Sequence, residues 1–300
     1  MNPRYVVFGE ALTDFIRQDD GRWLAVAGGA CWNVARVGAQ LGVPTAYAGA
    51  VSTDLFGQEL ARLTQLAGLD MRFLQQLDKP PLLAMVPSQH PPQYFFVGGD
   101  SADLHFDPSS LPAGWRSDAE IVHFGCISLA RQPLADKLVA EAVAAHAAGK
   151  RIAFDPNFRS PMRDPAYRPI LDTMAGLADF IKVSDEDLGG LFPGLSPDAG
   201  LQALQAMAPQ AAILLTCGAD GMALLHQGNG WRQPAFRVQV ADTVGCGDAA
   251  IGGWMASLLS RPAASEVQHL AYAAATAGLA ATRAGAYAPA RGEVERLLAA

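Results

Sequence analysis

Cysteine is scarce in this chain of 300 residues, and none of the spacings that mark zinc sites or disulfide frameworks occurs. The four cysteines are widely separated: Cys31, Cys126, Cys217 and Cys246. Isolated thiols of this kind are usual in reducing compartments, so we predict a cytoplasmic protein.

Long apolar runs and basic runs are also missing. The longest alanine-rich stretch, 272–282, is too short to span a bilayer, and Glu10 and Asp14 interrupt the first apolar stretch too early for a signal peptide. The formal net charge is −7, so neither nucleic acid nor an anionic membrane is expected as the main partner. A small phosphorylated ligand remains compatible, because backbone N–H groups can bind one locally.

What the chain does contain is enough apolar material for a large core, since 50% of its residues are hydrophobic. Short runs rich in Val, Ile and Phe predict strands buried on both faces: 5–8, 46–51, 121–124, 152–154, 180–183 and 212–215. Helix-like segments lie between them: 33–41, 59–67, 134–148 and 201–208. This alternation predicts an α/β fold with a doubly wound, mostly parallel sheet between helices.

Two regions interrupt this rhythm, 16–26 and 82–97, with QDDG and PSQHPPQ as turn signals. We predict that they form a small β-sheet lid, inserted at about 11–27 and 82–104 of one domain spanning 1–300. Surface hairpins without a function are the alternative. Farther on, the alternation at 236–240 predicts a strand, and 267–282 predicts an alanine-rich helix.

A glycine-rich turn, DTVGCGDAA at 242–250, lies between that strand and a helix. Gly245 and Gly247 allow a ligand to approach the backbone closely, and the N–H groups of the first helical turn favour an anion. Asp248 would repel a phosphate there. It is either a helix-capping residue or a base that accepts a proton from a hydroxyl beside a transferring phosphoryl group.

The same turn also fits the dinucleotide fingerprint GxGxxG/A, because Ala250 follows the two glycines at the required spacing. That fingerprint requires an acidic residue at the end of a second strand about 20 positions later. Here the corresponding Glu266 lies within an expected helix. A dehydrogenase is therefore disfavoured, and no Walker GxxxxGK[ST] loop is present either.

The turn resembles the C-terminal signature of the ribokinase-like (PfkB) carbohydrate kinases, DTxGAGD. Six further segments resemble motifs of that family in the same order, closest to its bacterial fructokinase branch: GEALTD at 9–14, GGACWNVA at 28–35, FDPNFR at 154–159, KVSDEDL at 182–188, LTCGADG at 215–221 and TRAGA at 282–286. The resemblance thus spans 9–286.

This resemblance implies a ribokinase-like fold and the transfer of the γ-phosphoryl group of ATP to a sugar hydroxyl. It implies these catalytic residues: Asp248 as the base, Gly245, Cys246 and Gly247 as the anion loop, and Arg159 to neutralise developing charge. It implies these sugar-binding residues: Asp14, Gly28, Gly29, Asn33 and again Asp248. Of the lid aromatics 94–96, Phe95 is our candidate for stacking on the sugar, although such a cluster can equally be core.

On the nucleotide side the resemblance implies ATP and Mg2+, and K+ as an activator. The residues that match nucleotide-binding positions are Ser184, Thr216, Gly218 and Gly221, together with Gly245 and Gly247. Asp187 matches a position that organises Mg2+ through water, although Ser184 and Asp187 also fit a capping box at a helix start. The residues that match a K+ site are Asp242, Val244 and Gly285.

Fructose is the expected substrate, and 2-keto-3-deoxygluconate, ribose and a nucleoside are the alternatives within the family. Two other classes stay open, a non-catalytic sugar sensor on the same fold and an NAD-dependent oxidoreductase. The sequence departs from the family pattern at Cys246, which replaces the usual Ala, and in lacking an Arg shortly before Ser101. We also expect a homodimer formed through the lid, because exposed apolar residues there would need covering.

Overall fold

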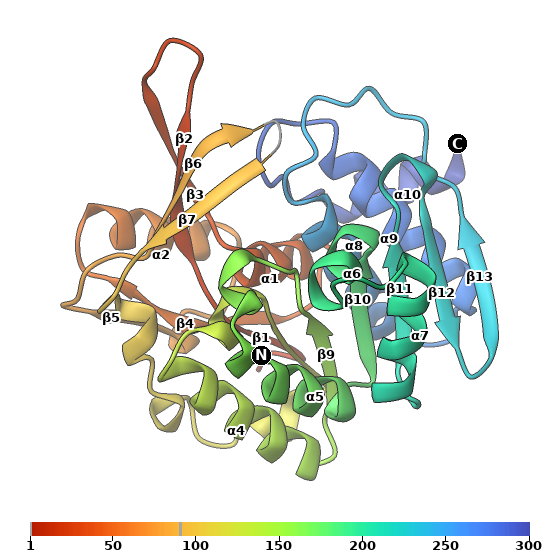
Figure 1. Ribbon diagram of the computed structural model, residues 1–300, viewed down its shortest axis with the longest axis horizontal. Helices are drawn as coiled ribbons and strands as arrows, with labels where there is room; N and C mark the ends of the chain where they lie inside the picture. The colour runs from red at the N-terminus through yellow and green to blue at the C-terminus, as the bar shows by residue number, and fades with distance from the viewer. Residues whose placement is uncertain (1, 90–91) are drawn as a thin grey trace.

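The computed structural model describes residues 2–89 and 92–300, so His90 and Pro91, in the second expected lid segment, lie outside the described residues. Its main sheet has nine strands, named here in spatial order: β13 (Asn229–Gln233), β12 (Met222–His226), β11 (Ala212–Thr216), β10 (Phe180–Ser184), β9 (Arg151–Asp155), β8 (Ile121–Gly125), β1 (Tyr5–Phe8), β4 (Thr45–Ser52) and β5 (Leu74–Leu77) (Figure 1). The strands from β11 to β5 pair in parallel, and β12 and β13 form an antiparallel edge.

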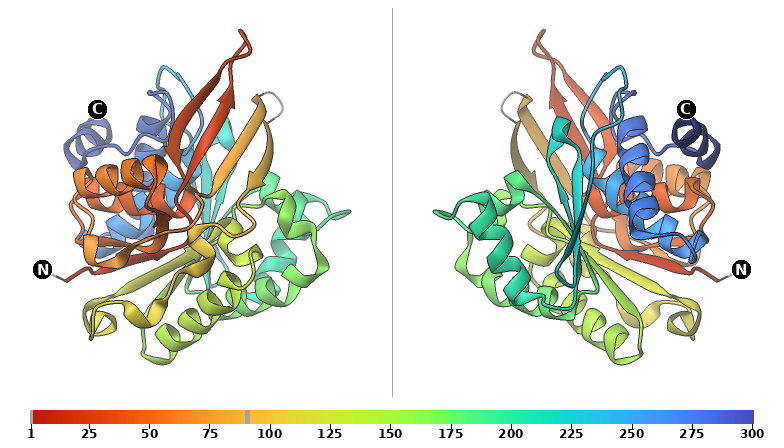
Figure 2. Two further views of the ribbon diagram at one scale, coloured as in Figure 1. Left: turned by 90° about the vertical axis from the view of Figure 1, so that its left-hand side faces the viewer. Right: turned by 90° about the vertical axis from the view of Figure 1, so that its right-hand side faces the viewer.

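Helices cover both faces of this sheet (Figure 2). One face carries α1 (Ala30–Gln40), α2 (Leu55–Leu66), α8 (Cys246–Ser260), α9 (Glu266–Ala280) and α10 (Arg291–Ala299). The other carries α3 (Trp115–Asp118), α4 (Leu134–Ala147), α5 (Arg168–Leu177), α6 (Asp185–Leu191) and α7 (Pro197–Met207). None of the helices in the described part of the chain is long and apolar enough to cross a membrane.

The apolar strands are uninterrupted because each strand supplies two cores. In β1, Tyr5 and Val7 belong to the core beneath α1 and α8, whereas Val6 and Phe8 belong to the core beneath α4 and α5. Successive side chains of a strand point to opposite faces, so both sets must be apolar. The predicted fold class, an α/β fold with a doubly wound, mostly parallel sheet, is confirmed.

The strand predicted at 236–240 is wrong, because these residues form no strand pairing. Phe236 and Val238 are half-buried and lie against Gly278 of α9, whereas Arg237 and Gln239 are exposed. An irregular segment that packs every second side chain against a helix produces the same alternation as a strand.

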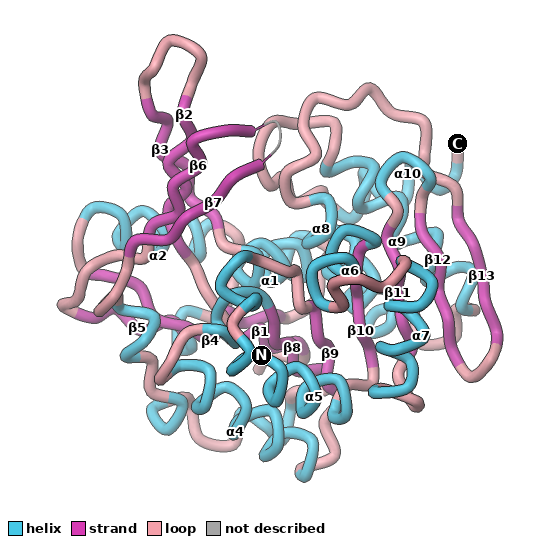
Figure 3. Tube along the Cα trace, in the orientation of Figure 1, coloured by secondary structure: helices cyan, strands magenta, loops and turns pink. Residues whose placement is uncertain are grey.

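A separate sheet of four strands, called the lid below, stands above the main sheet (Figure 3). In spatial order its strands are β3 (Trp23–Gly28), β2 (Leu12–Arg17), β6 (Leu83–Gln89) and β7 (Pro92–Val97). The register aligns Asp14 with Val26 and Ala84, and Ala84 with Phe96, so these side chains share one face of the lid.

Two adjacent glycines of α8 let this helix pack closely against its neighbours. A Cβ atom on Gly252 would lie 2.7 Å from a side-chain carbon of Val37 in α1, and one on Gly253 would lie 2.6 Å from the hydroxyl of Thr276 in α9. Because α8 begins at Cys246, this packing also fixes where the glycine-rich turn lies.

We predict that Gly253→Ala lowers the free energy of unfolding by about 1–3 kcal/mol, the usual cost of overpacking a well-packed contact. The matched control is Gly176→Ala in α5, where an added Cβ meets no atom within 4 Å. This control should equal or exceed the wild type, because alanine is the better helix former. Chemical denaturation of the three proteins checks both results, and equal losses in the two variants would contradict the packing argument.

Candidate active site

The candidate site lies at the carboxyl ends of the central strands, where ligands bind in open α/β sheets. Asp155 is the last residue of β9, Ser184 the last of β10 and Thr216 the last of β11. Ser184 and Thr216 are neighbours in the strand register. The chain leaving the same end of β1 enters the lid within four residues, so the lid rises beside this edge.

The glycine-rich turn forms an anion loop at the N-terminus of α8. Gly245 is the N-cap residue with φ 77°, and an added Cβ would lie 2.7 Å from Cβ of Ala286, so a side chain is excluded there. The N–H of Cys246 donates to the carbonyl of Thr243 at 3.2 Å. In contrast, the N–H groups of Gly247 and Asp248 have no acceptor among the described residues. Two free donors at a helix start fit a phosphate group.

Asp248 lies in the first turn of α8 and is only 7% exposed. Its Oδ2 accepts a hydrogen bond of 2.9 Å from Nδ2 of Asn33. Burial raises the pKa of this carboxyl, against the opposing effects of the Asn33 hydrogen bond and of the Lys182 and Arg159 charges. The carboxylate makes no capping bond to the helix, so the geometry favours the base over the capping interpretation.

The residues predicted to bind the sugar meet around this carboxylate. Gly29 is the N-cap of α1, Asn33 lies in the first turn of that helix, and Asp14 lies on β2 of the lid. A Cβ atom on Gly28 would lie 2.2 Å from Oδ2 of Asp14, so Gly28 leaves the room that this carboxylate occupies.

Asp14 is half-buried, and its charge interacts with charged groups of the main domain. Burial raises the pKa of its carboxyl to about 7; the Arg159 charge opposes this shift, and the Asp248 and Glu10 charges add to it. Asp14 therefore faces the same space as Asp248 and Arg159.

Phe95 does not face that space, and its placement at the sugar is corrected here. Side chains alternate along β7, and Phe96 shares the lid face of Asp14 through Ala84, so Phe95 points from the opposite face and is 53% exposed. Tyr94 shares the face of Phe96, and its ring lies 5.4 Å from the guanidinium carbon of Arg159. Tyr94 is thus a lid aromatic that lies beside the site.

Arg159 follows β9 on the segment Asp155–Arg159. Its Nη1 donates to the carbonyls of Asn157 at 3.3 Å and Phe158 at 2.8 Å, which orient the guanidinium. A fixed guanidinium beside Asp14 and Asp248 can balance a developing negative charge.

Ser184 and Asp187 form the capping box that starts α6. The Ser184 hydroxyl accepts from the N–H of Asp187, and Oδ2 of Asp187 accepts from the N–H of Ser184, both at 2.9 Å. Oδ1 of Asp187 also accepts from the N–H of Phe158 at 2.8 Å. With both oxygens already engaged, Asp187 fits Mg2+ only through water, and the described residues contain no cluster of three or more His, Cys, Asp or Glu for direct metal binding.

The remaining predicted residues lie in two turns at the same edge of the sheet. Gly218 and Gly221 bound the short turn that follows Thr216. In the second turn, Oδ1 of Asp242 accepts from the N–H of Val244 at 3.0 Å, and Oδ2 accepts from the N–H of Gly285 at 2.8 Å. The structure therefore brings together Asp242, Val244 and Gly285, the three residues that match a K+ site.

Sequence reasoning assigned no role to three buried charged residues beside the site: Glu10, Asp155 and Lys182. Glu10 accepts a hydrogen bond of 3.0 Å from the N–H of Ala30, at the start of α1, and another from the Ser128 hydroxyl. Lys182 is 3% exposed within β10. The sequence pattern could have identified Lys182, since a lysine inside an otherwise apolar strand must be paired with a counter-charge when the strand is buried.

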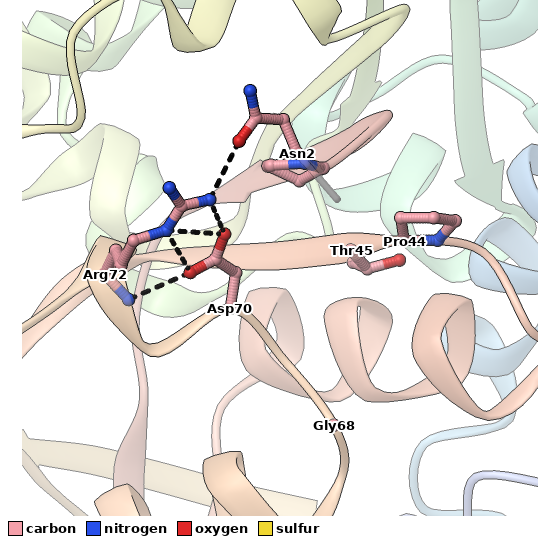
Figure 4. Close-up of a pocket in the computed structure, with 7 residues that line it drawn as sticks. Asn2, Pro44, Thr45, Gly68, Asp70 and Arg72 are labelled. Carbon is pink, nitrogen blue, oxygen red and sulfur yellow. Dashed lines mark hydrogen bonds and ion pairs between the residues drawn. The ribbon is translucent and has the colours of Figure 1, made fainter.

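Two surface hollows lie outside this site. One, of about 410 Å³, surrounds the exposed Arg72–Asp70 ion pair at the amino ends of β1 and β4, the sheet edge opposite Asp248 (Figure 4). Its lining residues are Asn2, Pro3, Pro44, Thr45, Gly68, Asp70 and Arg72. The other, of about 420 Å³, lies between the end of β7 and Arg131.

Comparison with known proteins relates this geometry to one family. The family described as pfkB family carbohydrate kinase matches residues 2–291. A fructokinase of Klebsiella pneumoniae is 31% identical over 95% of both chains. The crystal structure of a fructokinase from Xylella fastidiosa with bound ATP superposes with a TM-score of 0.88 at 30% identity, over 99% of this chain and 98% of that one. An aminoimidazole riboside kinase from Salmonella enterica, solved with aminoimidazole riboside and an ATP analogue, has a TM-score of 0.85 at 25% identity over 98% and 99%.

We predict that Asp14→Asn stabilises the ligand-free protein at pH 8 more than at pH 5. The pKa of Asp14 is about 7 in the folded protein and near 3.8 in the unfolded chain, so the folded protein holds this proton longer as pH rises. The stability that the protonated carboxyl contributes to the wild type is therefore lost as pH rises through 7, and the variant has no such loss. The difference in unfolding free energy between variant and wild type should grow by more than about 1 kcal/mol between these pH values. Denaturation at both pH values checks this.

The control is Asp19→Asn at the exposed lid turn between β2 and β3, and the difference for Asp14→Asn should grow well beyond the difference for this control. Equal differences for the two variants would show that the carboxyl of Asp14 is not held in a desolvated position.

Proposed function

This chain belongs to the pfkB family of carbohydrate kinases, ATP-dependent phosphotransferases, and we propose that its sugar substrate is fructose. The observation that carries the proposal is the hydrogen bond between Asn33 and Asp248, beside the N–H groups of Gly247 and Asp248 that have no acceptor in the described part of the chain. A base, a hydroxyl-binding amide and a phosphate-binding helix start thus meet beneath one lid. The support for fructose is the likeness to fructokinases, although the riboside kinase has nearly the same structure.

In the proposed mechanism ATP lies along Ser184 and Thr216, with its γ-phosphoryl group toward the N–H groups of Gly247 and Asp248. Asn33 and Asp14 orient the sugar so that one hydroxyl points at Asp248. This carboxylate accepts the hydroxyl proton as the sugar oxygen attacks phosphorus in line with the departing ADP oxygen. The lid excludes water, which would otherwise compete as the acceptor.

Two ions belong to the proposal. Asp187 would hold Mg2+ through water, and the ion would supply positive charge that neutralises the phosphate groups of ATP. K+ would lie by the turn that Asp242 holds, near Val244 and Gly285. The four cysteines are free thiols in this structure, which supports the reducing cytoplasm that we propose as the location.

We expect Asp248→Asn to reduce kcat by roughly 10²–10⁴-fold, the usual range for loss of a general base. The amide can still accept the Asn33 hydrogen bond through its oxygen, so the melting temperature should change little. Asp172→Asn, exposed on α5, is the matched control and should keep wild-type kcat. Near-normal kcat in Asp248→Asn would contradict the assignment of Asp248 as the base.

We expect the wild type to release ADP faster with fructose than with 2-keto-3-deoxygluconate, ribose or aminoimidazole riboside, compared as kcat/KM under identical conditions. A higher value for another of these sugars would replace fructose and leave the kinase intact. Sugar binding without any ADP release would indicate a sensor. Turnover seen only as a change in nicotinamide absorbance would indicate an oxidoreductase.

We further propose that the protein forms a homodimer through the lid. Among the described residues, the face opposite Asp14 carries three large exposed apolar side chains, Trp23, Phe95 and Val97, at 42%, 53% and 48% exposure. An exposed apolar patch on a projecting sheet is typical of an interaction surface.

We therefore expect Phe95→Glu to convert the dimer to a monomer in light scattering, because it would bury a charge at the interface. Val143→Glu, at a position 47% exposed on α4, should leave the dimer unchanged. A monomeric wild type at micromolar concentration would overturn the proposal.

A further inference from the structure

Lys182 is the one charged residue in the strand β10, Phe180–Ser184. Ile181 and Val183 point into the core beneath α5 and α6, whereas Phe180 packs against Trp254 of α8. Alternation therefore directs Lys182 to the side of α8, and its side chain is 4% exposed. A lysine buried this deeply needs counter-charges.

Two carboxylates supply them. Nζ of Lys182 lies 3.3 Å from Oδ2 of Asp155 at the end of β9, and 3.6 Å from Oδ2 of Asp187 in α6. Two carboxylates at these distances favour the charged ammonium over the neutral amine. The ammonium links two strands and a helix.

The third neighbour of the ammonium is the anion loop. A Cβ atom built on Gly247 would lie 3.0 Å from Nζ and 3.4 Å from Cε of Lys182, so the lysine tip packs directly against Gly247. The N-terminus of a helix carries partial positive charge, and a cation beside it opposes the helix dipole. This position is unfavourable for α8 alone and favourable once an anion lies between them.

If Lys182 only completed the fold, an apolar side chain would serve there once its partners were neutral, because such replacements of buried ion pairs are often tolerated. The surrounding charges indicate that Lys182 also balances negative charge around the anion loop. Asp155, Asp187 and Asp248 place three carboxylates around the loop that must receive phosphate oxygens, against the cations Lys182 and Arg159. Without Lys182 the loop would face incoming phosphate with an excess of negative charge.

We propose that Lys182 is a positioning residue for phosphoryl transfer, which supports the anion loop at Gly247 and places a fixed positive charge behind it. The inference rests on the kinase activity of the proposed function, whichever sugar is the acceptor. The bond from phosphorus to ADP breaks as the bond to the sugar oxygen forms, and the hydroxyl proton goes to Asp248. Lys182 keeps its proton and acts only on the charge that spreads over the phosphoryl oxygens.

The test compares the full-length wild type with Lys182→Met, Lys182→Arg and the double variant Lys182→Met/Asp155→Asn. The control is Lys137→Met, which removes another partly buried lysine, bonded to the carbonyls of Leu104 and Phe106. For each protein we would measure the melting temperature, kcat, both KM values, and the affinities for ADP alone and for ADP with aluminium fluoride, a mimic of the transferring phosphoryl group, in the presence of the best sugar.

We expect Lys182→Met to lose roughly 10²–10³-fold in kcat, the range seen when one group that stabilises transition-state charge is removed. Affinity for ADP with aluminium fluoride should fall by a similar factor, while affinity for ADP alone and both KM values change by less than roughly threefold. Lys182→Arg should recover part of the lost kcat, because it restores the charge. Lys137→Met should lower only the melting temperature.

The double variant shows whether Lys182 acts on the phosphoryl group or only neutralises the charge of Asp155. It also covers the case in which Lys182→Met does not fold. It removes both charges of the Lys182–Asp155 pair, so the fold should tolerate it better. The proposal expects kcat to stay low, because no cation remains behind Gly247. Recovery of wild-type kcat in the double variant, or equal losses of affinity for ADP alone and for ADP with aluminium fluoride in Lys182→Met, would overturn it. A wild type that releases no ADP with any sugar would instead overturn the proposed function, and the inference with it.

Discussion

The hydrogen bond between Asn33 and Asp248 is the contact on which the site depends, because it joins residues 215 positions apart in the sequence. It places the first turn of α1 against the first turn of α8. Further contacts support both helix starts, since Glu10 accepts a hydrogen bond from the N–H of Ala30 in α1 and Gly245 turns the chain into α8 beside Ala286. The close packing of Gly252 on Val37 maintains the same approach one turn farther along.

Electrostatic balance is the second constraint on this site. Burial disfavours every ionised carboxylate here, and the raised pKa values of Asp14, Asp155 and Asp248 reflect that cost. The buried cation and the helix start offset part of it. The site is therefore suited to a charged ligand that brings its own counter-ions.

Most of the fold could be predicted from the sequence, because strands buried on both faces leave apolar runs that a single chain displays directly. The edge hairpin β12–β13 was not predicted. Its outer strand β13 is half exposed and carries polar residues such as Asn229 and Gln233, so it leaves no apolar run in the sequence. The motifs also selected Asp248 and Asn33, which the structure brings into hydrogen-bond contact. They could not decide which of Tyr94 and Phe95 faces the sugar side, because that depends on the pairing of β7 with β6, and a shift of one residue reverses it.

The lid joins the helix α1 directly on the side of β3. This strand ends at Gly28, and α1 begins two residues later at Ala30, with Gly29 as the only residue between them. The strand β3 and the helix that carries Asn33 are therefore covalently adjacent, and the angle between them is set by the backbone of two glycines, the most permissive of the residues.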